Sequence, residues 1–493
     1  MFIKDNRRPD MPDGIRYGEF VDMISHMNQN SLLLELARRT SAEGILDNYD
    51  PSKQGQNWVP PFAYADVARA SISQGNREGF PAIGEIVDDY LHASIRIYVP
   101  NVEDLGEFGA HQNELRMMHI QGTDQQSPFS RAASAMALFT RTKIPPRAKL
   151  KVMKGDWFEE IMGVSLDELF YILMNLSLMF QIGKGVLTIK DLHRPIFAQA
   201  IETVSVEKFI HVLNIMSLDL ESFRVMEAEE REGVEEGLQR LTHNPLGSSP
   251  FITGVTRGYV APVWHWISSQ VSTANLYYAL ISRAGSDFAG DLGQLFEAYV
   301  GEQLALLNVR LQEEVEYKDG KNRVKTTDWI LELGGLTILI ECKSTRPDKH
   351  VQRADEDMLA FVKDRVSKAV KQLNNTNAIF DTVIPADMSR ATMRVGIVLT
   401  MEPFYAVAET LAAIPDMAPD IPVAVINIRE LEALVTLGSR RVEELISKSV
   451  EEAKQSGLMY FDLSEALAVT QHQDNPILAA AWDESILVKT LGG

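Results

Sequence analysis

The sequence predicts an α/β protein in which a mostly helical region, residues 1–240, precedes a region, residues 241–493, that is built on a sheet flanked by helices. Two patterns lead to this fold class. In the first region apolar residues recur with helical spacing, whereas in the second short apolar runs alternate with amphipathic stretches. The acidic segment 227–237 (EAEEREGVEEG) lies between the two patterns and reads as a helix tail, a linker or both. We place the domain boundary near it.

Helix starts in the first region are marked by serines. Ser165 precedes an apolar stretch and Glu168 follows three positions on, which is the pattern of a capping box. Ser205 and Ser217 stand before similar stretches and predict two further helix starts. Segment 95–104 (IRIYVPNVED) reads as a strand. We therefore expect short helices joined by tight turns.

The second region reads as alternating helices and strands. Its first helix is predicted by the apolar stripe in DFAGDLGQLFEAYVGEQLALLN, which begins at Asp287. The elements expected after it are a strand at 309–317, a turn at 318–322, a hairpin at 328–343, a helix from about 353 to 375, strands at 394–400 and 421–428, and helices at about 403–414 and 429–456.

The hairpin carries the most informative charges of the sequence. Gly334-Gly335 suits a two-residue turn, and equal steps away from this pair place Asp328 opposite Glu341. Strand alternation puts Lys343 on the same face as Glu341. Like charges that face each other across a strand pair destabilise the sheet unless a positive charge lies between them. The spacing therefore predicts a divalent cation site.

Composition limits the chemistry of such a site. Cys342 is the only cysteine, which excludes an intrachain disulfide and a zinc site built from cysteines. The ten histidines are scattered. A bound metal is therefore expected to be a hard cation with oxygen ligands, Mg²⁺ or Mn²⁺.

Charge and hydropathy limit partners and location. The net charge of −20 argues against broad, nonspecific adhesion to nucleic acid, although segment 335–375 is locally basic. Apolar runs are too short to span a bilayer, and the N-terminus lacks the apolar core of a secretory signal. We therefore expect a cytoplasmic protein without membrane partners.

The order helix, three strands, helix, strand resembles the PD-(D/E)XK nuclease superfamily, whose restriction-endonuclease-like fold has a central mixed sheet flanked by helices. The resemblance covers about residues 287–400 and rests on Asp328 in the second strand and Glu341-Cys342-Lys343 in the third. Thr327 stands where the proline of the motif's name would be, a departure that is common in the family.

The resemblance implies a role for each residue of the motif. Asp328, Glu341 and the main-chain carbonyl of Cys342 are expected to bind Mg²⁺ or Mn²⁺, which polarises the phosphate and activates water. Lys343 is expected to orient this water and to stabilise negative charge on the phosphate.

Two helical residues are added by the same resemblance. Glu297 stands where many members carry a catalytic glutamate on the first core helix, and it is expected to bind a second metal or to anchor Lys343. Gln372, on the helix after the motif, is expected to have an accessory role.

The implied function is a metal-dependent nuclease, an endonuclease acting on DNA in bacterial genome defence, including antiviral defence, or in DNA processing. Residues 1–240 are then expected to act in recognition or assembly, through a protein partner or a homo-oligomer. One alternative is a non-catalytic nucleic-acid-binding or assembly protein with the same fold. Another is an enzyme that cleaves RNA, because nothing in the sequence reads a 2′-hydroxyl.

Overall fold

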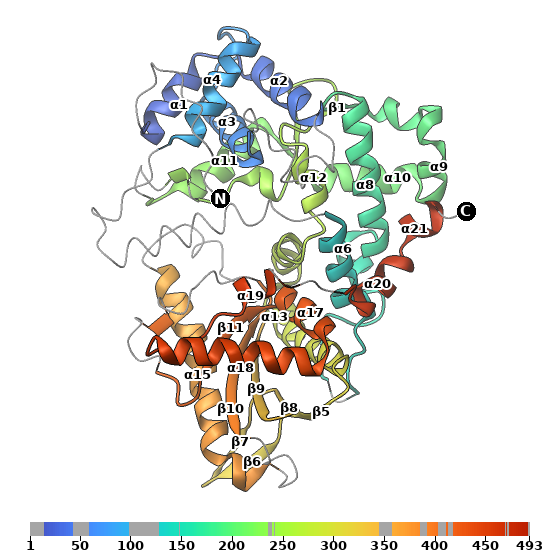
Figure 1. The fold of residues 1–493 in the computed structure, drawn as a ribbon. Coiled ribbons are helices and arrows are strands. Elements are labelled where there is room, and N and C mark those ends of the chain that lie inside the picture. Colours follow the sequence, from blue (N-terminus) through green and yellow to red (C-terminus); the bar gives the residue numbers. More distant parts are fainter. Residues whose placement is uncertain are drawn as a thin grey trace.

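The computed structural model describes residues 14–42, 59–97, 128–146, 148–234, 239–240, 242–344, 357–384, 392–402, 411–412, 418–468, 470 and 473–491. Helices and a small sheet form one end of the molecule, and a larger sheet with its covering helices forms the other (Figure 1). The first end contains the helices α1 (Tyr17–Ser25), α2 (Gln29–Ala42), α3 (Pro61–Gln74), α4 (Gly84–Ile95), α8 (Leu166–Ile182), α9 (Ala198–Thr203), α10 (Val206–Ile215), α11 (Leu220–Arg231) and α12 (His265–Ser269). Its sheet has the order β1 (Val186–Leu187), β4 (Tyr259–Val260), β3 (Phe251–Thr253), β2 (Ser217–Asp219).

Two of the three predicted serine caps are confirmed. The Ser165 hydroxyl accepts the N–H of Glu168 at 3.2 Å, and the Glu168 carboxylate accepts the N–H of Ser165 at 3.0 Å, so α8 begins with the predicted capping box. Ser205 caps α10. The prediction for Ser217 is wrong, because this residue begins β2, which pairs in parallel with β3. The helix starts later, after Asp219, since the long-range strand partner overrides the local signal.

The segment predicted as a strand at 95–104 lies partly outside the described residues. Helix α4 continues through Ile95, and Ile97 forms a single bridge with Ile15. Residues 98–104 are not described. Within the described part, the helix therefore replaces the start of the predicted strand.

The segment 227–237 begins as the tail of α11. Its Glu227 side chain is 2% exposed and lies against α3, and the apolar residues of segment 246–263 pack in the same cluster as those of 15–97. The hydrophobic core of the first end therefore continues past the segment at which the sequence suggested a boundary.

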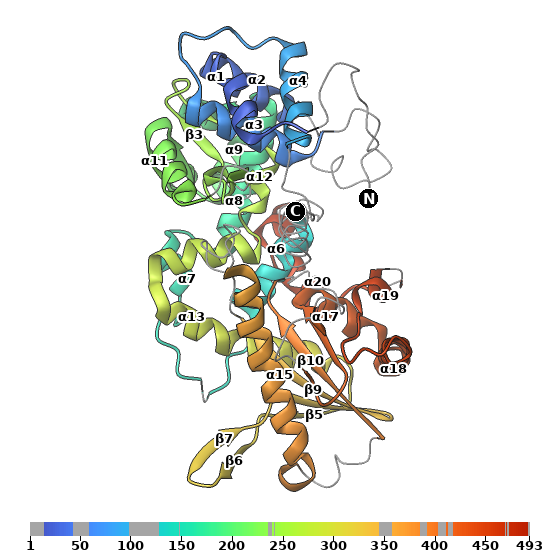
Figure 2. The same cartoon turned by 90° about the vertical axis from the view of Figure 1, so that its left-hand side faces the viewer.

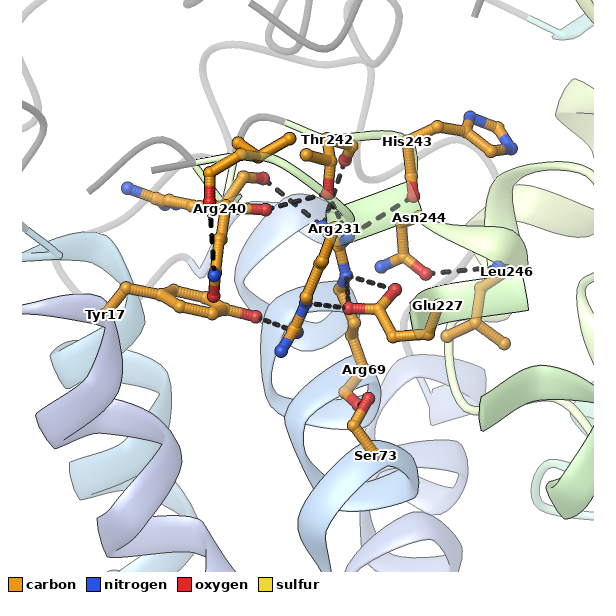
Figure 3. Close-up of polar contacts among 12 residues, drawn as sticks. Tyr17, Arg69, Ser73, Glu227, Arg231, Arg240, Thr242, His243, Asn244 and Leu246 are labelled. Atoms are coloured by element: carbon orange, nitrogen blue, oxygen red, sulfur yellow. Dashed lines mark hydrogen bonds and ion pairs between the residues drawn. The ribbon is translucent and has the colours of Figure 1, made fainter. Parts of the chain in front are cut away.

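A buried polar cluster joins α3 and α11 (Figure 3). The Arg69 guanidinium donates from Nε to both carboxylate oxygens of Glu227, at 2.7 and 2.8 Å, and from Nη1 to the Thr242 carbonyl at 3.0 Å. Arg231 also pairs with Glu227 and donates to the Tyr17 hydroxyl. These contacts tie α1, α3, α11 and the chain near residue 242 into one unit.

The larger sheet is mixed. It has the order β11 (Val423–Asn427), β10 (Met393–Thr400), β9 (Leu336–Lys343), β8 (Trp329–Leu333), β5 (Arg310–Glu313). Neighbours β5, β8 and β9 run antiparallel, whereas β9, β10 and β11 run parallel. The predicted strand 309–317 is divided, because β5 ends at Glu313 and a separate hairpin of β6 (Glu316–Asp319) and β7 (Asn322–Lys325) encloses the predicted turn.

Helices cover both faces of this sheet (Figures 1 and 2). On one face, apolar residues of α15 (Asp357–Val383) pack on β9 and β10. The other face is covered by α13 (Thr273–Ala305), α17 (Ile428–Leu434) and α18 (Ser439–Gln455). The single helix predicted at 429–456 is divided at Gly438, whose φ of 78° interrupts the helix. Of the helix predicted at 403–414, only residues 411–412 are described.

The two ends of the molecule share packing. Helix α13 contacts α6 (Pro128–Met136) and α7 (Trp157–Met162), and the C-terminal helices α20 (Pro476–Asp483) and α21 (Ile486–Leu491) return to α6 and α8. The short helix α19 (Ser464–Ala468) lies on α17. None of the helices within the described ranges is both long and apolar enough to cross a membrane.

The β8–β9 hairpin has the predicted register. Leu333 pairs with Leu336 across Gly334 and Gly335. Gly334 has a φ of 57°, and a Cβ at this position would overlap the carboxylate of Glu443, which accepts the Gly335 N–H at 2.7 Å. The turn therefore requires glycine for its backbone conformation and for the space that α18 fills.

Candidate functional site

The candidate site lies where β8 begins and β9 ends. The strand ladder stops at the pair Trp329 and Ile340, and Asp328 lies one residue outside it, in a bend. The Asp328 carboxylate accepts the main-chain N–H of Cys342 at 2.7 Å. The pairing of Asp328 with Glu341 predicted from the spacing is thus replaced by a contact from side chain to main chain. This contact still keeps the Asp328 carboxylate beside the end of β9.

Glu341 and Lys343 form an ion pair on β9. The Lys343 Nζ lies 2.6 Å from Oε1 of Glu341. Glu341 is only 3% exposed, and its second oxygen, Oε2, has no hydrogen-bond partner within the described part of the chain. Buried polar atoms are normally satisfied, so an orphaned carboxylate oxygen in a folded protein indicates a functional constraint or an absent ligand.

Glu297 reaches the same region from α13. The Trp329 indole donates to the Glu297 carbonyl at 3.0 Å, and its ring fills the space that a side chain at Gly301 would occupy. This contact fixes α13 against the start of β8. It therefore fixes the distance between Glu297 and Asp328.

Burial is the main cause of a raised pKa in all three carboxyl groups of the site. Burial, and then the negative charge of Asp328, raise the pKa of Glu341 to about 8 and the pKa of Glu297 to about 7. Burial also raises the pKa of Asp328, although the N–H of Cys342 opposes this effect. Each carboxylate is therefore costly to ionise without a neighbouring cation.

Gln372 lies near the site but does not contact the carboxylates. Its amide Nε2 donates to the Thr326 carbonyl at 3.1 Å. One turn further along α15, the Thr376 hydroxyl accepts the N–H of Thr327 at 2.9 Å. Helix α15 thus holds the backbone directly before Asp328. The sequence suggested Gln372, but it gave no signal for Thr376.

A groove of about 730 Å³ opens on the α13 side of Asp328. It is lined by Lys143, Pro145, Ala148, Lys149, Gln294, Glu297, Ala298, Gly301, Glu302, Ala305, Glu313, Glu314, Glu316, Lys325, Asp328 and Trp329. Glu341 and Lys343 are not among these lining residues. The groove therefore leads to Asp328 and Glu297 and does not reach the Glu341–Lys343 pair.

The groove also contains charges that sequence reasoning missed. Glu314, between β5 and β6, raises the pKa of both Glu297 and Asp328, and it forms an ion pair with Lys325 at 2.7 Å. No pattern in the neighbouring sequence indicates Glu314. This residue comes close to the site because the chain leaves the sheet after β5 to form the β6–β7 hairpin. Lys143 and Lys149 belong to residues 1–240, which the sequence predicts to be mostly helical without marking either lysine.

The oxygen donors of the site suit a hard divalent cation. No cluster of three or more histidine, cysteine or acidic side chains around one point is found in the described ranges. The donors seen at the end of β9 are the carboxylate of Asp328, which lies against the Cys342 N–H, and the carboxylate of Glu341, whose Oε2 has no partner among the described residues. Glu297 supplies a further carboxylate on the groove side.

No family model, curated protein or solved structure matches this chain.

Proposed function

We propose that this protein is a metal-dependent nuclease whose core, residues 287–400, has a restriction-endonuclease-like fold. The order α13, β5, β8, β9, α15, β10 agrees with the helix, three strands, helix, strand of that fold, with the β6–β7 hairpin inserted. The parallel pairing of β9 with β10 makes the sheet mixed, in agreement with the same fold.

One observation carries the proposal: a buried carboxylate with an orphaned oxygen lies at the end of an otherwise apolar strand. Glu341 follows the run LTILI, and among the described residues Lys343 is the one cationic side chain paired with its carboxyl group. A strand buried on both faces is normally apolar throughout. Strongly perturbed carboxyl groups beside a groove are typical of functional sites.

The residues have distinct roles in this proposal. A bound Mg²⁺ or Mn²⁺ supplies Lewis acidity toward the phosphate and lowers the pKa of an attacking water. Asp328 and Glu341 hold the cation, with the Cys342 carbonyl as a third donor. Lys343 places its ammonium group beside Glu341, where it orients the water and stabilises charge on the phosphate. Glu297 holds a second cation or a proton on the groove side.

The substrate we propose is DNA, and the cellular role is genome defence or DNA processing. Residues 1–240 would recognise a partner or assemble the protein, and α13 joins this region to the catalytic core. RNA is the second substrate to be tested, because the same site would hydrolyse either phosphodiester.

Purified full-length protein is incubated with linear, circular and single-stranded DNA and with RNA, in Mg²⁺, Mn²⁺ or EDTA. Wild type is compared with Asp328→Asn and Lys343→Met, and with Glu332→Gln, a carboxylate on β8 outside the site, as the matched control. We expect cleavage that needs a divalent cation, persists in the control and falls at least a hundredfold in the two site variants.

Two results would contradict the proposal. The first is cleavage that is equal in wild type and both site variants, which would indicate a contaminating nuclease. The second is the absence of cleavage on every substrate with either metal, which would favour the non-catalytic alternative. Cleavage of RNA but not DNA would support the proposed chemistry and would show that the substrate is RNA.

A further inference from the structure

The β6–β7 hairpin, residues 316–325, extends from the larger sheet beside the candidate site. The chain leaves the sheet after its edge strand β5, forms the hairpin and returns to the sheet at β8. Figure 2 shows the hairpin projecting past the edge of this sheet. Its two strands pair only with each other. The hairpin, called the arm below, is therefore a two-stranded ribbon outside the sheet that carries the site.

Hydrogen bonds at the base of the arm fix it to the chain just before Asp328. The Val315 N–H donates to the Thr326 hydroxyl at 2.9 Å, and the Thr326 N–H donates to the Val315 carbonyl at 3.1 Å. Thr326 is fully buried, and its own carbonyl accepts the amide of Gln372 from α15. The arm is therefore anchored two residues before Asp328, which gives it a fixed direction from the site.

Strand pairing places charged residues on one face of the arm. Directly opposite residues share a face, and so do residues two positions apart in a strand. At the base of the arm Glu316 pairs with Lys325, and both residues line the groove that leads to Asp328. The next pair on the same face is Lys318 and Arg323. This outer pair therefore continues the groove-lining face away from the site.

Two positive charges face each other in the outer pair. Lys318 is exposed and forms no ion pair with the side chains that the structure describes. The Arg323 side chain is 79% exposed, and its Nη1 lies 3.8 Å from the nearest oxygen of Glu316, which is a long ion pair. Like charges directly opposite each other destabilise a strand pair. An anion bound between Lys318 and Arg323 would therefore stabilise the arm.

Positive charge is most available at the outer half of the arm. Lys321, in the turn, is a further exposed cation without an ion pair to a described side chain. At the base, by contrast, Lys325 is engaged by Glu314 at 2.7 Å. The whole chain has a net charge of −20, so a cluster of exposed cations beside an acidic groove departs from its average surface. The partner that fits this cluster is an anion.

The basic face of the arm has no aromatic residue. The alternate pairs of the register, Tyr317 with Val324 and Asp319 with Asn322, belong to the other face. Proteins that bind unpaired nucleic acid strands stack the bases on aromatic side chains along a basic groove. The basic face of the arm lacks such a platform and offers charge alone. It therefore suits phosphates whose bases are already stacked and paired.

We propose that Lys318, Lys321 and Arg323 bind the phosphate backbone of a DNA duplex that reaches the groove at Asp328. Lysine and arginine neutralise phosphates, and this contact requires no particular base sequence. The anchored base holds the bound duplex in a fixed direction from the candidate cation site. This inference rests on the proposed nuclease function, because it names the form of DNA that the site receives.

The test measures binding of full-length protein to a labelled DNA duplex and to one of its single strands, by fluorescence anisotropy in Ca²⁺ over a range of salt. Lys318→Ala/Arg323→Ala, the arm variant, is compared with wild type. The matched control is Lys190→Ala/Arg257→Ala, which removes the same two residue types from exposed positions at the other end of the molecule. Circular dichroism and the thermal midpoint verify that both variants fold.

A second variant, Lys318→Glu, separates the charge of the arm from its stability. A glutamate at this position faces Arg323, and opposite charges across a strand pair are favourable. The thermal midpoint of Lys318→Glu should therefore be no lower than that of wild type. Its affinity for the duplex should nevertheless be lower than that of Lys318→Ala, because the glutamate repels phosphate.

The expected result has three parts. Wild type binds the duplex more tightly than the single strand. The arm variant binds the duplex more weakly, and its plot of log K against log salt is shallower by about 1.8, because each phosphate contact to a duplex contributes about 0.9. The control variant has the wild-type slope. In a cleavage assay the arm variant raises KM more than it lowers kcat, since these contacts hold ground state and transition state alike.

The outcomes separate this inference from the proposed function. A shallower slope in the arm variant, without cleavage by wild type in Mg²⁺ or Mn²⁺, would support the binding arm and contradict the nuclease. Cleavage by wild type with equal slope and KM in the arm and control variants would overturn the binding arm and keep the nuclease. Tighter binding of the single strand than of the duplex, or no binding of the duplex by wild type, would also overturn the inference.

Discussion

Replacing Glu341 by glutamine is expected to stabilise the metal-free protein at neutral pH. In the unfolded chain this carboxyl has its ordinary pKa of 4.5, whereas burial raises it to about 8 in the folded protein. Between these values the folded state binds a proton that the unfolded state releases, so stability falls as the pH rises from 4.5 to about 8. At pH 7 the cost is about 3 kcal/mol, because each tenfold change in proton affinity is worth about 1.4 kcal/mol. Glutamine cannot ionise and avoids this cost.

The assay is calorimetric unfolding in EDTA at pH 5, 6, 7 and 8. At pH 5 wild type and the glutamine variant should unfold at nearly the same temperature. By pH 8 the thermal midpoint of the variant should be several degrees above that of wild type. This follows because about 1 kcal/mol shifts the midpoint of a 150–250-residue unit by about 2–4 °C. Adding Mg²⁺ should raise the midpoint of wild type and have less effect on the variant.

Glu332→Gln is the matched control for this prediction, because it changes a carboxylate on the same hairpin outside the site. Its midpoint should differ from wild type by a similar amount at each pH. The reasoning about Glu341 would be refuted if its glutamine variant were less stable than wild type at pH 8, or if the difference between the two proteins did not change with pH.

Three further substitutions test other contacts. Gly334→Ala should lower the free energy of unfolding by about 1–2 kcal/mol or more, measured by denaturant unfolding, because alanine is strained at positive φ and its Cβ meets a glutamate carboxylate of α18. Glu227→Gln should lower it by about 3–5 kcal/mol, because the charge of Arg69, 1% exposed, loses its carboxylate partner. Thr376→Val should speed hydrogen exchange at the amide of Thr327, measured by mass spectrometry, because that N–H loses its acceptor.

Matched variants separate these effects from general ones. Gly320 also has a positive φ but open space around it, so Gly320→Ala reports the backbone cost alone. Glu19 forms an exposed ion pair with Arg16, so Glu19→Gln should lower stability far less than Glu227→Gln does. Equal losses in either matched pair would contradict the corresponding argument, as would unchanged exchange at Thr327 in the Thr376 variant.

Local patterns determined the parts of the site that lie close together in the sequence. The Gly-Gly pair and the alternation of side chains predict the register of β8 and β9. The register of a hairpin is set by its turn and by which side chains face the core. The capping box at Ser165 likewise involves residues three positions apart. These predictions hold because all their contacts fall within one element or one turn.

Other features depend on contacts between distant segments. Ser217 becomes part of a strand only because β3 lies beside it. Gln372 faces a main-chain carbonyl instead of the carboxylates, because the orientation of α15 is set by its apolar packing on the sheet. Periodicity gives the face of a helix that is buried, but it does not give the helix's position along the sheet.

The sequence by itself determined the turn and the register of the β8–β9 hairpin, and this register brings Asp328 close to the end of β9, where Glu341 and Lys343 lie. Only the tertiary structure decided how Asp328 turns to the Cys342 amide, and which groove its carboxylate meets. That groove is lined by segments far apart in the chain. These segments come together through tertiary packing, which cannot be predicted from local sequence patterns.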